Sequence, residues 1–129
     1  SVDSIKLAEE IDRHAGRIGK CQDILIEVNI GGEKSKSGIA ASGLEELVYQ
    51  VSELENIRVR GLMAIPPAGS SERFLFDMQK LYIDISQKKI HNISMDYLSM
   101  GMSGDYEAAI KYGANMVRIG RGLFGPRNY

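Results

Sequence analysis

Hydrophobic residues along the chain alternate between helical spacing and continuous strand-like runs. The first apolar series keeps a helical period from residue 5 and ends at Gly19, a residue type that commonly terminates helices. Residues 24–30 then form an apolar, β-branched run, which is typical of a strand buried on both faces. Because Gly31 and Gly32 follow, the pattern predicts a helix over 5–18 and a strand over 24–30.

The same alternation continues to the end of the chain. After a polar loop over 33–41, Ser42 stands three residues before Glu45 as a capping box, which predicts a helix from there to residue 54. Further strands are expected over 57–65, 97–100 and 116–119. A helix is expected from Ser71 to residue 85, another from Ser103 to Gly113, and a short helical turn over 121–124.

Strictly alternating strands and helices imply parallel strands joined by right-handed crossovers. The expected fold class is α/β, in a single domain over residues 1–129. The strands suit either an open doubly wound sheet or part of a closed (β/α)8 barrel, which typically needs ~250 residues. Residues 1–3 resemble the end of a strand, and the chain starts at Ser1 without an initiator methionine, so we expect a fragment.

Composition and charge exclude several classes of function. Sixteen Lys and Arg residues face seventeen Asp and Glu residues, so no basic excess indicates a nucleic-acid partner. No apolar run is long enough to cross a membrane. The single Cys21 excludes an internal disulfide and favours a reducing, cytoplasmic compartment. His14 and His91 have no partner at metal-ligand spacing, so no metal is expected.

Parallel sheets bind ligands beyond the carboxyl ends of their strands, and two glycine-rich loops lie there. In the first loop, Ser99, Gly101, Met102 and Ser103 precede an expected helix, whose N-terminus favours phosphate. The alternative is that Ser103 only caps the helix and the glycines only shape a turn.

The second glycine-rich loop combines Gly120 and Arg121 ahead of the short helical turn, the usual place for a phosphate site in barrels. Arg118 interrupts an otherwise apolar strand, so we expect it to point inward, either toward a ligand or into an ion pair with Glu27 or Asp105. Lys34 and Lys36 are expected at the same carboxyl end of the sheet. They either belong to a solvated loop or attract an anionic ligand.

Four segments in this order resemble the pyridoxal-phosphate homeostasis protein family, whose barrel is related to that of alanine racemase. The segments are 26–39, 60–66, 98–110 and 117–125, and the resemblance covers essentially the whole chain. It implies a (β/α)8 barrel that holds pyridoxal 5′-phosphate (PLP), with the phosphate cradled by residues 99–103 and 120–121 and Arg118 facing the pyridine nitrogen. It also implies a role in vitamin B6 homeostasis without established catalytic turnover.

The chain departs from that family in two places. The family continues Arg-Ile-Gly with Thr-Ala, whereas this chain has Gly120-Arg121-Gly122, so a threonine hydroxyl is missing. The lysine that holds the PLP aldehyde in the family lies on the first barrel strand, and we expect this chain to hold only about strands 4 to 8. It would then bind the phosphate end alone and self-associate through exposed strand edges. The alternatives are a PLP-dependent amino-acid racemase, or an interaction module without a ligand.

Overall fold

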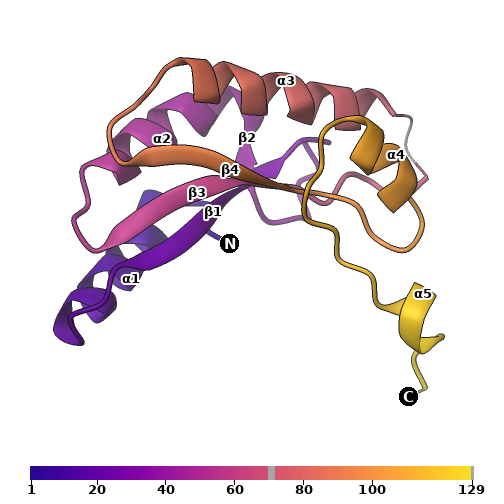
Figure 1. The fold of residues 1–129 in the computed structure, drawn as a ribbon, viewed down its shortest axis with the longest axis horizontal. Coiled ribbons are helices and arrows are strands. Elements are labelled where there is room, and N and C mark those ends of the chain that lie inside the picture. The colour runs from indigo at the N-terminus through magenta and orange to yellow at the C-terminus, as the bar shows by residue number, and fades with distance from the viewer. Residues whose placement is uncertain (70–71, 129) are drawn as a thin grey trace.

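The computed structural model describes residues 1–69 and 72–128, and it alternates helices and strands from end to end. Figure 1 shows the longer helices beside a small sheet, with the C-terminal segment extending away from it. The elements are α1 (Ile5–Arg17), β1 (Gln22–Asn29), β2 (Ile39–Ala40), a 3-10 turn (Ala41–Gly43), α2 (Leu44–Ser52), β3 (Ile57–Met63), α3 (Arg73–Gln87), β4 (Ile93–Ser99), α4 (Tyr106–Lys111) and α5 (Arg121–Phe124).

The sheet contains four parallel strands in the order β2-β1-β3-β4. This confirms the prediction of a parallel α/β fold. Single bridges extend the sheet at both sides, because Val2 pairs with Ile26 of β1 and Met116 pairs with Ser99 of β4. The strand predicted over 116–119 is therefore wrong beyond Met116. The backbone N–H of Arg118 donates to the carbonyl of Gly101, in the loop that follows β4, and not to a residue of the strand ladder.

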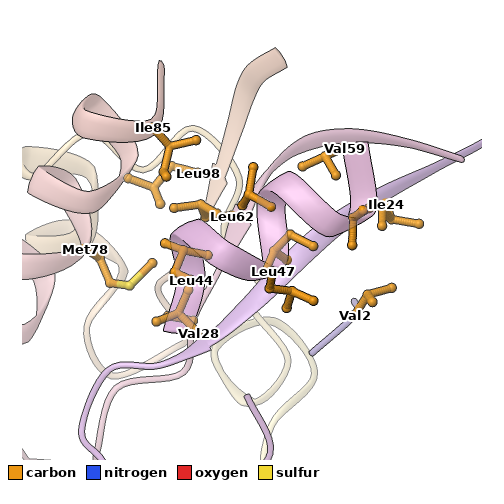
Figure 2. Close-up of a cluster of buried hydrophobic side chains, with 14 of the residues drawn as sticks. Val2, Ile24, Val28, Leu44, Leu47, Val59, Leu62, Met78, Ile85 and Leu98 are labelled. Atoms are coloured by element: carbon orange, nitrogen blue, oxygen red, sulfur yellow. The ribbon is translucent and has the colours of Figure 1, made fainter. Parts of the chain in front are cut away.

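The hydrophobic core lies on one face of the sheet, where α1, α2 and α3 pack against it. In β1 the buried residues alternate as Ile24, Ile26 and Val28, and the residues between them are half-buried or exposed. Figure 2 shows strand side chains meeting Leu44 of α2 and Met78 of α3 in one cluster. The prediction that β1 is buried on both faces is wrong, because helices cover one face only.

The other face of the sheet is polar. Arg60 of β3 lies between two carboxylates, with Nη1 2.9 Å from Asp23 of β1 and Nε 2.6 Å from Asp96 of β4. Its guanidinium also lies 5.3 Å from the ring centroid of Tyr97. Ion pairs thus cross three neighbouring strands on the face that no helix covers.

A close approach of β3 and β4 depends on Gly61. A Cβ built at this position would lie 1.8 Å from the backbone carbonyl oxygen of Tyr97. The ladder shifts register here, from Val59 opposite Ile93 to Gly61 opposite Tyr97. This irregularity accommodates the polar residues Ser94 and Asp96, and β4 begins at Ile93 rather than at the predicted Tyr97.

Several other boundaries differ from the predictions. The capping box at Ser42 is absent because a 3-10 turn occupies 41–43, and α2 begins at Leu44 with no side-chain cap bond. β3 ends at Met63, two residues before the predicted end. The predicted start of α3, Ser71, lies outside the described residues, and the helix runs over Arg73–Gln87. Among the described residues, no helix is long and apolar enough to cross a membrane.

Short segments cover parts of both sheet edges. At the β4 edge, the Asn115 side chain accepts a hydrogen bond from the N–H of Leu98 at 2.8 Å and donates to the carbonyl of Asp96 at 2.7 Å. At the β1 edge, the N–H of Val2 donates to Leu25, and its carbonyl accepts from Glu27, both at 2.8 Å. Backbone groups that would otherwise face solvent are satisfied at these points.

Candidate functional site

A cavity of about 870 Å³ lies at the carboxyl ends of the strands, and we call it the carboxyl-end cavity. Both glycine-rich loops border it, as the sequence predicted, together with the loop after β3. Of the predicted site residues, the following line it: Gly101, Met102, Ser103, Gly120 and Arg121. The topology of parallel strands brings these loops together, since all of them leave the sheet at the same end.

The first glycine-rich loop is held by Asp105. Its Oδ1 accepts a hydrogen bond from the N–H of Met102 at 2.8 Å, while the N–H of Asp105 itself donates to the Met102 carbonyl at 3.1 Å. α4 begins only at Tyr106, so the predicted helix start at Ser103 is wrong. The physical reason is this closed turn, which occupies the three residues before the helix.

Gly101 is required for packing in this loop. Its φ is +107°, a conformation that favours glycine, and an added Cβ would lie 2.8 Å from the Cβ of Ala109 in α4. Gly101 therefore permits a close approach between this loop and α4. By contrast, a Cβ added at Gly104 or Gly120 would meet no atom within 4 Å.

A hydrogen bond to a serine side chain joins the two glycine-rich loops. The Oγ of Ser103 accepts from the N–H of Gly122 at 2.9 Å. Ser103 is thus a link between loops rather than the helix cap that the sequence allowed as an alternative. Gly122 belongs to α5, a helix of 4 residues whose side chains are all exposed.

Arg118 and Ser99 form a polar contact beneath the loops. The guanidinium donates from Nη1 to the buried Ser99 hydroxyl and from Nη2 to the carbonyl of Ala64 at 3.0 Å. Burial lowers the pKa of Arg118, and the charges of Glu27 and Asp105 oppose that shift from a distance. Arg118 therefore points inward as predicted, held by neutral oxygen atoms. Neither Arg118 nor Ser99 lines the carboxyl-end cavity.

The rim of the cavity is rich in positive charge. Lys36, Arg121 and Arg127 line it, and Asp105 is the carboxylate among the described lining residues. Lys36 comes from the polar loop after β1, and its Nζ lies 3.3 Å from Glu33. The amide of Asn29 fixes the start of that loop, donating to the Glu33 carbonyl at 2.7 Å and accepting from the Glu33 N–H at 3.2 Å.

An apolar wall completes the cavity, and of its residues sequence reasoning identified only Met102. It contains Ile65, Pro66 and Pro67 after β3, with Met102 and Phe124. Phe124 is 85% exposed, although it is the largest apolar side chain at the site. The proline pair, which was interpreted only as the end of a strand, was the signal available in the sequence.

Other candidates lie away from this cavity. His14 is exposed on α1, with Nε2 3.6 Å from Glu10. The described residues contain no cluster of three or more potential metal ligands of the His, Cys, Asp or Glu type. A second cavity of about 630 Å³ runs along α3 and contains none of the predicted site residues.

The fold and the carboxyl-end cavity define a parallel α/β protein with a candidate anion site at the ends of its strands. The family model described as "Alanine racemase, N-terminal domain" matches residues 1–128, and the chain belongs to that family. The pyridoxal phosphate homeostasis protein of Aquifex aeolicus is 41% identical over 133 residues, covering 100% of this chain and 58% of the relative.

Solved structures agree with this assignment. PipY of Synechococcus elongatus PCC7942, solved with PLP bound, superimposes with a TM-score of 0.87 at 32% identity, over 97% of this chain and 59% of PipY. Alanine racemase of Clostridium difficile 630, in complex with cycloserine, has a TM-score of 0.75 at 18% identity, over 99% of this chain and 36% of the racemase, and shows the fold alone. The expected resemblance to part of a racemase-type barrel is confirmed, and the chain spans a little over half the length of the homeostasis relative.

Proposed function

We propose that this chain binds PLP through its phosphate group in the carboxyl-end cavity and serves PLP homeostasis without catalytic turnover. The observation that carries the proposal is the convergence of two glycine-rich loops, joined by the Ser103–Gly122 hydrogen bond, under a cationic rim. The relatives named above support it, because one carries the homeostasis name and another was solved with PLP.

The residues of the cavity fit the phosphate end of PLP. The hydroxyl of Ser103 and the N–H of Gly122 form a hydrogen bond with each other, so these two polar groups lie side by side. Arg121 and Lys36 add positive charge that a phosphate dianion would offset. Arg121 thereby supplies a cation at the position where the homeostasis family has a threonine hydroxyl. The apolar wall suits the flat ring of the ligand.

The case against turnover rests on the charge at Arg118 and on the lysines. Bound PLP would supply an electron-withdrawing ring, which is a stronger electron sink when its nitrogen is protonated. The Arg118 cation, held by Ser99 and Ala64 outside the lining of the cavity, would disfavour protonation of the ring nitrogen only where the bound ligand places that nitrogen beside it. Among the described lining residues, Lys36 is the lysine. It lies in a loop, not in a strand, and its ammonium pairs with Glu33. A racemase would need a fixed lysine and a second acid or base.

The test is a PLP titration of the chain followed by visible absorption, with inorganic phosphate as competitor. We expect binding that phosphate displaces and that Ser103→Ala weakens about tenfold, the effect of one lost hydrogen bond to an ion. Ser86→Ala serves as the matched control, because that hydroxyl donates to Ile83 within α3. Binding that phosphate leaves unchanged would overturn the proposal.

Borohydride reduction and mass analysis then test the lysine argument. We expect no stable adduct on this chain. An adduct at Lys36, together with alanine racemisation by the purified protein, would favour the racemase alternative. We further propose a cytoplasmic location, consistent with the exposed free thiol of Cys21, and self-association through the sheet edges that remain open.

A further inference from the structure

Asp105 places a negatively charged carboxylate in the cavity that we propose binds an anion. It lines the carboxyl-end cavity together with the cations Lys36, Arg121 and Arg127. Its charge also acts on the buried guanidinium of Arg118 from a distance. A negative side chain at this position reduces the attraction that the surrounding cations exert on a phosphate group.

The same carboxylate occupies a backbone donor of the cavity. Oδ1 of Asp105 accepts from the N–H of Met102 at 2.8 Å, and Met102 lines the cavity. Asp105 is the residue before α4, yet its side chain makes no cap bond to that helix. The carboxylate therefore faces back into the glycine-rich loop, where it satisfies the N–H of a residue that lines the cavity.

We propose that Asp105 is an internal competitor for the ligand phosphate, which limits the affinity of the cavity and speeds release. This inference rests on the proposed function, since it concerns the same cavity. When the cavity is empty, Asp105 satisfies the Met102 N–H. When a phosphate approaches, the two anions repel each other across the loop, and the carboxylate retakes the donor as the ligand leaves. Reversible loading is what a carrier of PLP requires, whereas tight retention suits an enzyme.

Two neutral variants remove the charge of Asp105, and the first of them also keeps its hydrogen bond. Asp105→Asn keeps an oxygen acceptor for the Met102 N–H and removes the charge. Asp105→Ser is also neutral and is a favourable residue before a helix, so it covers the case in which the first variant misfolds. Glu46→Gln is the matched control, because it removes one negative charge from an exposed position on α2.

The measurement is the dissociation constant for inorganic phosphate and for PLP, by calorimetry, at low and at high salt. We expect Asp105→Asn to bind both about tenfold more tightly at low salt, and the gain to shrink at 0.5 M salt because the repulsion is screened. Stopped-flow release of PLP should slow accordingly. Pyridoxal, which lacks the phosphate, should bind all variants equally, and Glu46→Gln should match the wild type.

The outcomes distinguish this inference from the proposed function. If the wild type binds phosphate and both neutral variants bind it no better, Asp105 is a structural residue of the loop and the inference is wrong. If the gain is the same at both salt concentrations or extends to pyridoxal, the cause is cavity shape rather than charge, and the inference is again wrong. If neither wild type nor variants bind phosphate, the proposed function fails and the inference fails with it.

Discussion

The hydroxyl of Ser103 and the backbone N–H of Gly122, 19 residues apart, form a hydrogen bond that links the two glycine-rich loops. In Ser103→Ala the Gly122 amide loses its acceptor and opens to solvent. We expect its hydrogen exchange to become about tenfold faster, which corresponds to one ordinary hydrogen bond. Amide exchange followed by nuclear magnetic resonance measures this directly. The Met102 amide, held by Asp105, is the internal control, and an unchanged rate at Gly122 would contradict the structure.

Gly61 should tolerate no side chain. In Gly61→Ala the new Cβ would lie 1.8 Å from the Tyr97 carbonyl oxygen, so β3 and β4 must separate locally. We expect a loss of about 2–3 kcal/mol in the free energy of unfolding, measured by urea denaturation. Gly104→Ala is the control, because its Cβ meets nothing within 4 Å and should leave the stability nearly unchanged. Equal stability of the two variants would be evidence against the register shift.

The Arg60–Asp96 ion pair predicts a pH dependence of stability. The hydrogen bond that Asp96 accepts from Arg60 is the main cause that lowers the pKa of Asp96 below its ordinary value of 3.8. A lowered pKa in the folded state stabilises the protein above pH 3.8, and that contribution disappears as the pH falls through the folded pKa. Asp96→Asn should therefore melt at a lower temperature than the wild type at pH 7. The two melting curves should converge in strong acid.

Thermal melting at a series of pH values tests this. Asp84→Asn, an exposed residue of α3 whose Oδ2 lies 3.9 Å from the Lys88 ammonium, is a suitable control for a peripheral ion pair. A difference between wild type and Asp96→Asn that persists below the folded pKa would mean that the carboxylate charge is not what stabilises the sheet.

Asn115 protects the open edge of β4 with its side chain. Its amide satisfies the Leu98 N–H and the Asp96 carbonyl, as a neighbouring strand would. We expect Asn115→Ala to free both backbone groups, to destabilise the fold by about 1–2 kcal/mol and to increase self-association. Sedimentation velocity at several concentrations measures the second effect. Gln50→Ala, on the exposed side of α2, should behave as wild type. If Asn115→Ala self-associates no more than the wild type, this edge is not the site of association.

Much of the fold could be predicted from hydrophobic period. Helical spacing placed α1 and α3 to within two residues of their observed ends, because each presents one apolar stripe to the core. The period could not reveal that helices cover only one face of β1, since a branched apolar residue such as Leu25 suits a half-buried position as well as a buried one. Nor could it find the start of β4, where Ser94 and Asp96 face polar neighbours.

The candidate site was predictable where glycine and charge stand together, and less so where contacts are made through space. Arg118 in an apolar segment predicted an inward cation, but its partners proved to be the Ser99 hydroxyl and the Ala64 carbonyl rather than a carboxylate. Asp105 was considered as such a carboxylate, and its bond to the Met102 N–H emerges only from the loop geometry. The apolar wall that includes Phe124 depends on tertiary packing, which spacing does not encode.

The guanidinium of Arg118 is oriented by two neutral acceptors, while Glu27 and Asp105 influence it only through space. Its positive charge is thus in place before any ligand arrives, and no reorganisation is needed to present it. In kinetic terms, we expect such a preset field to raise the rate at which small anions encounter this end of the sheet. Its reach is about the Debye length, ~8 Å at physiological salt. We therefore expect the strand ends to attract anions before any donor of the loops makes contact.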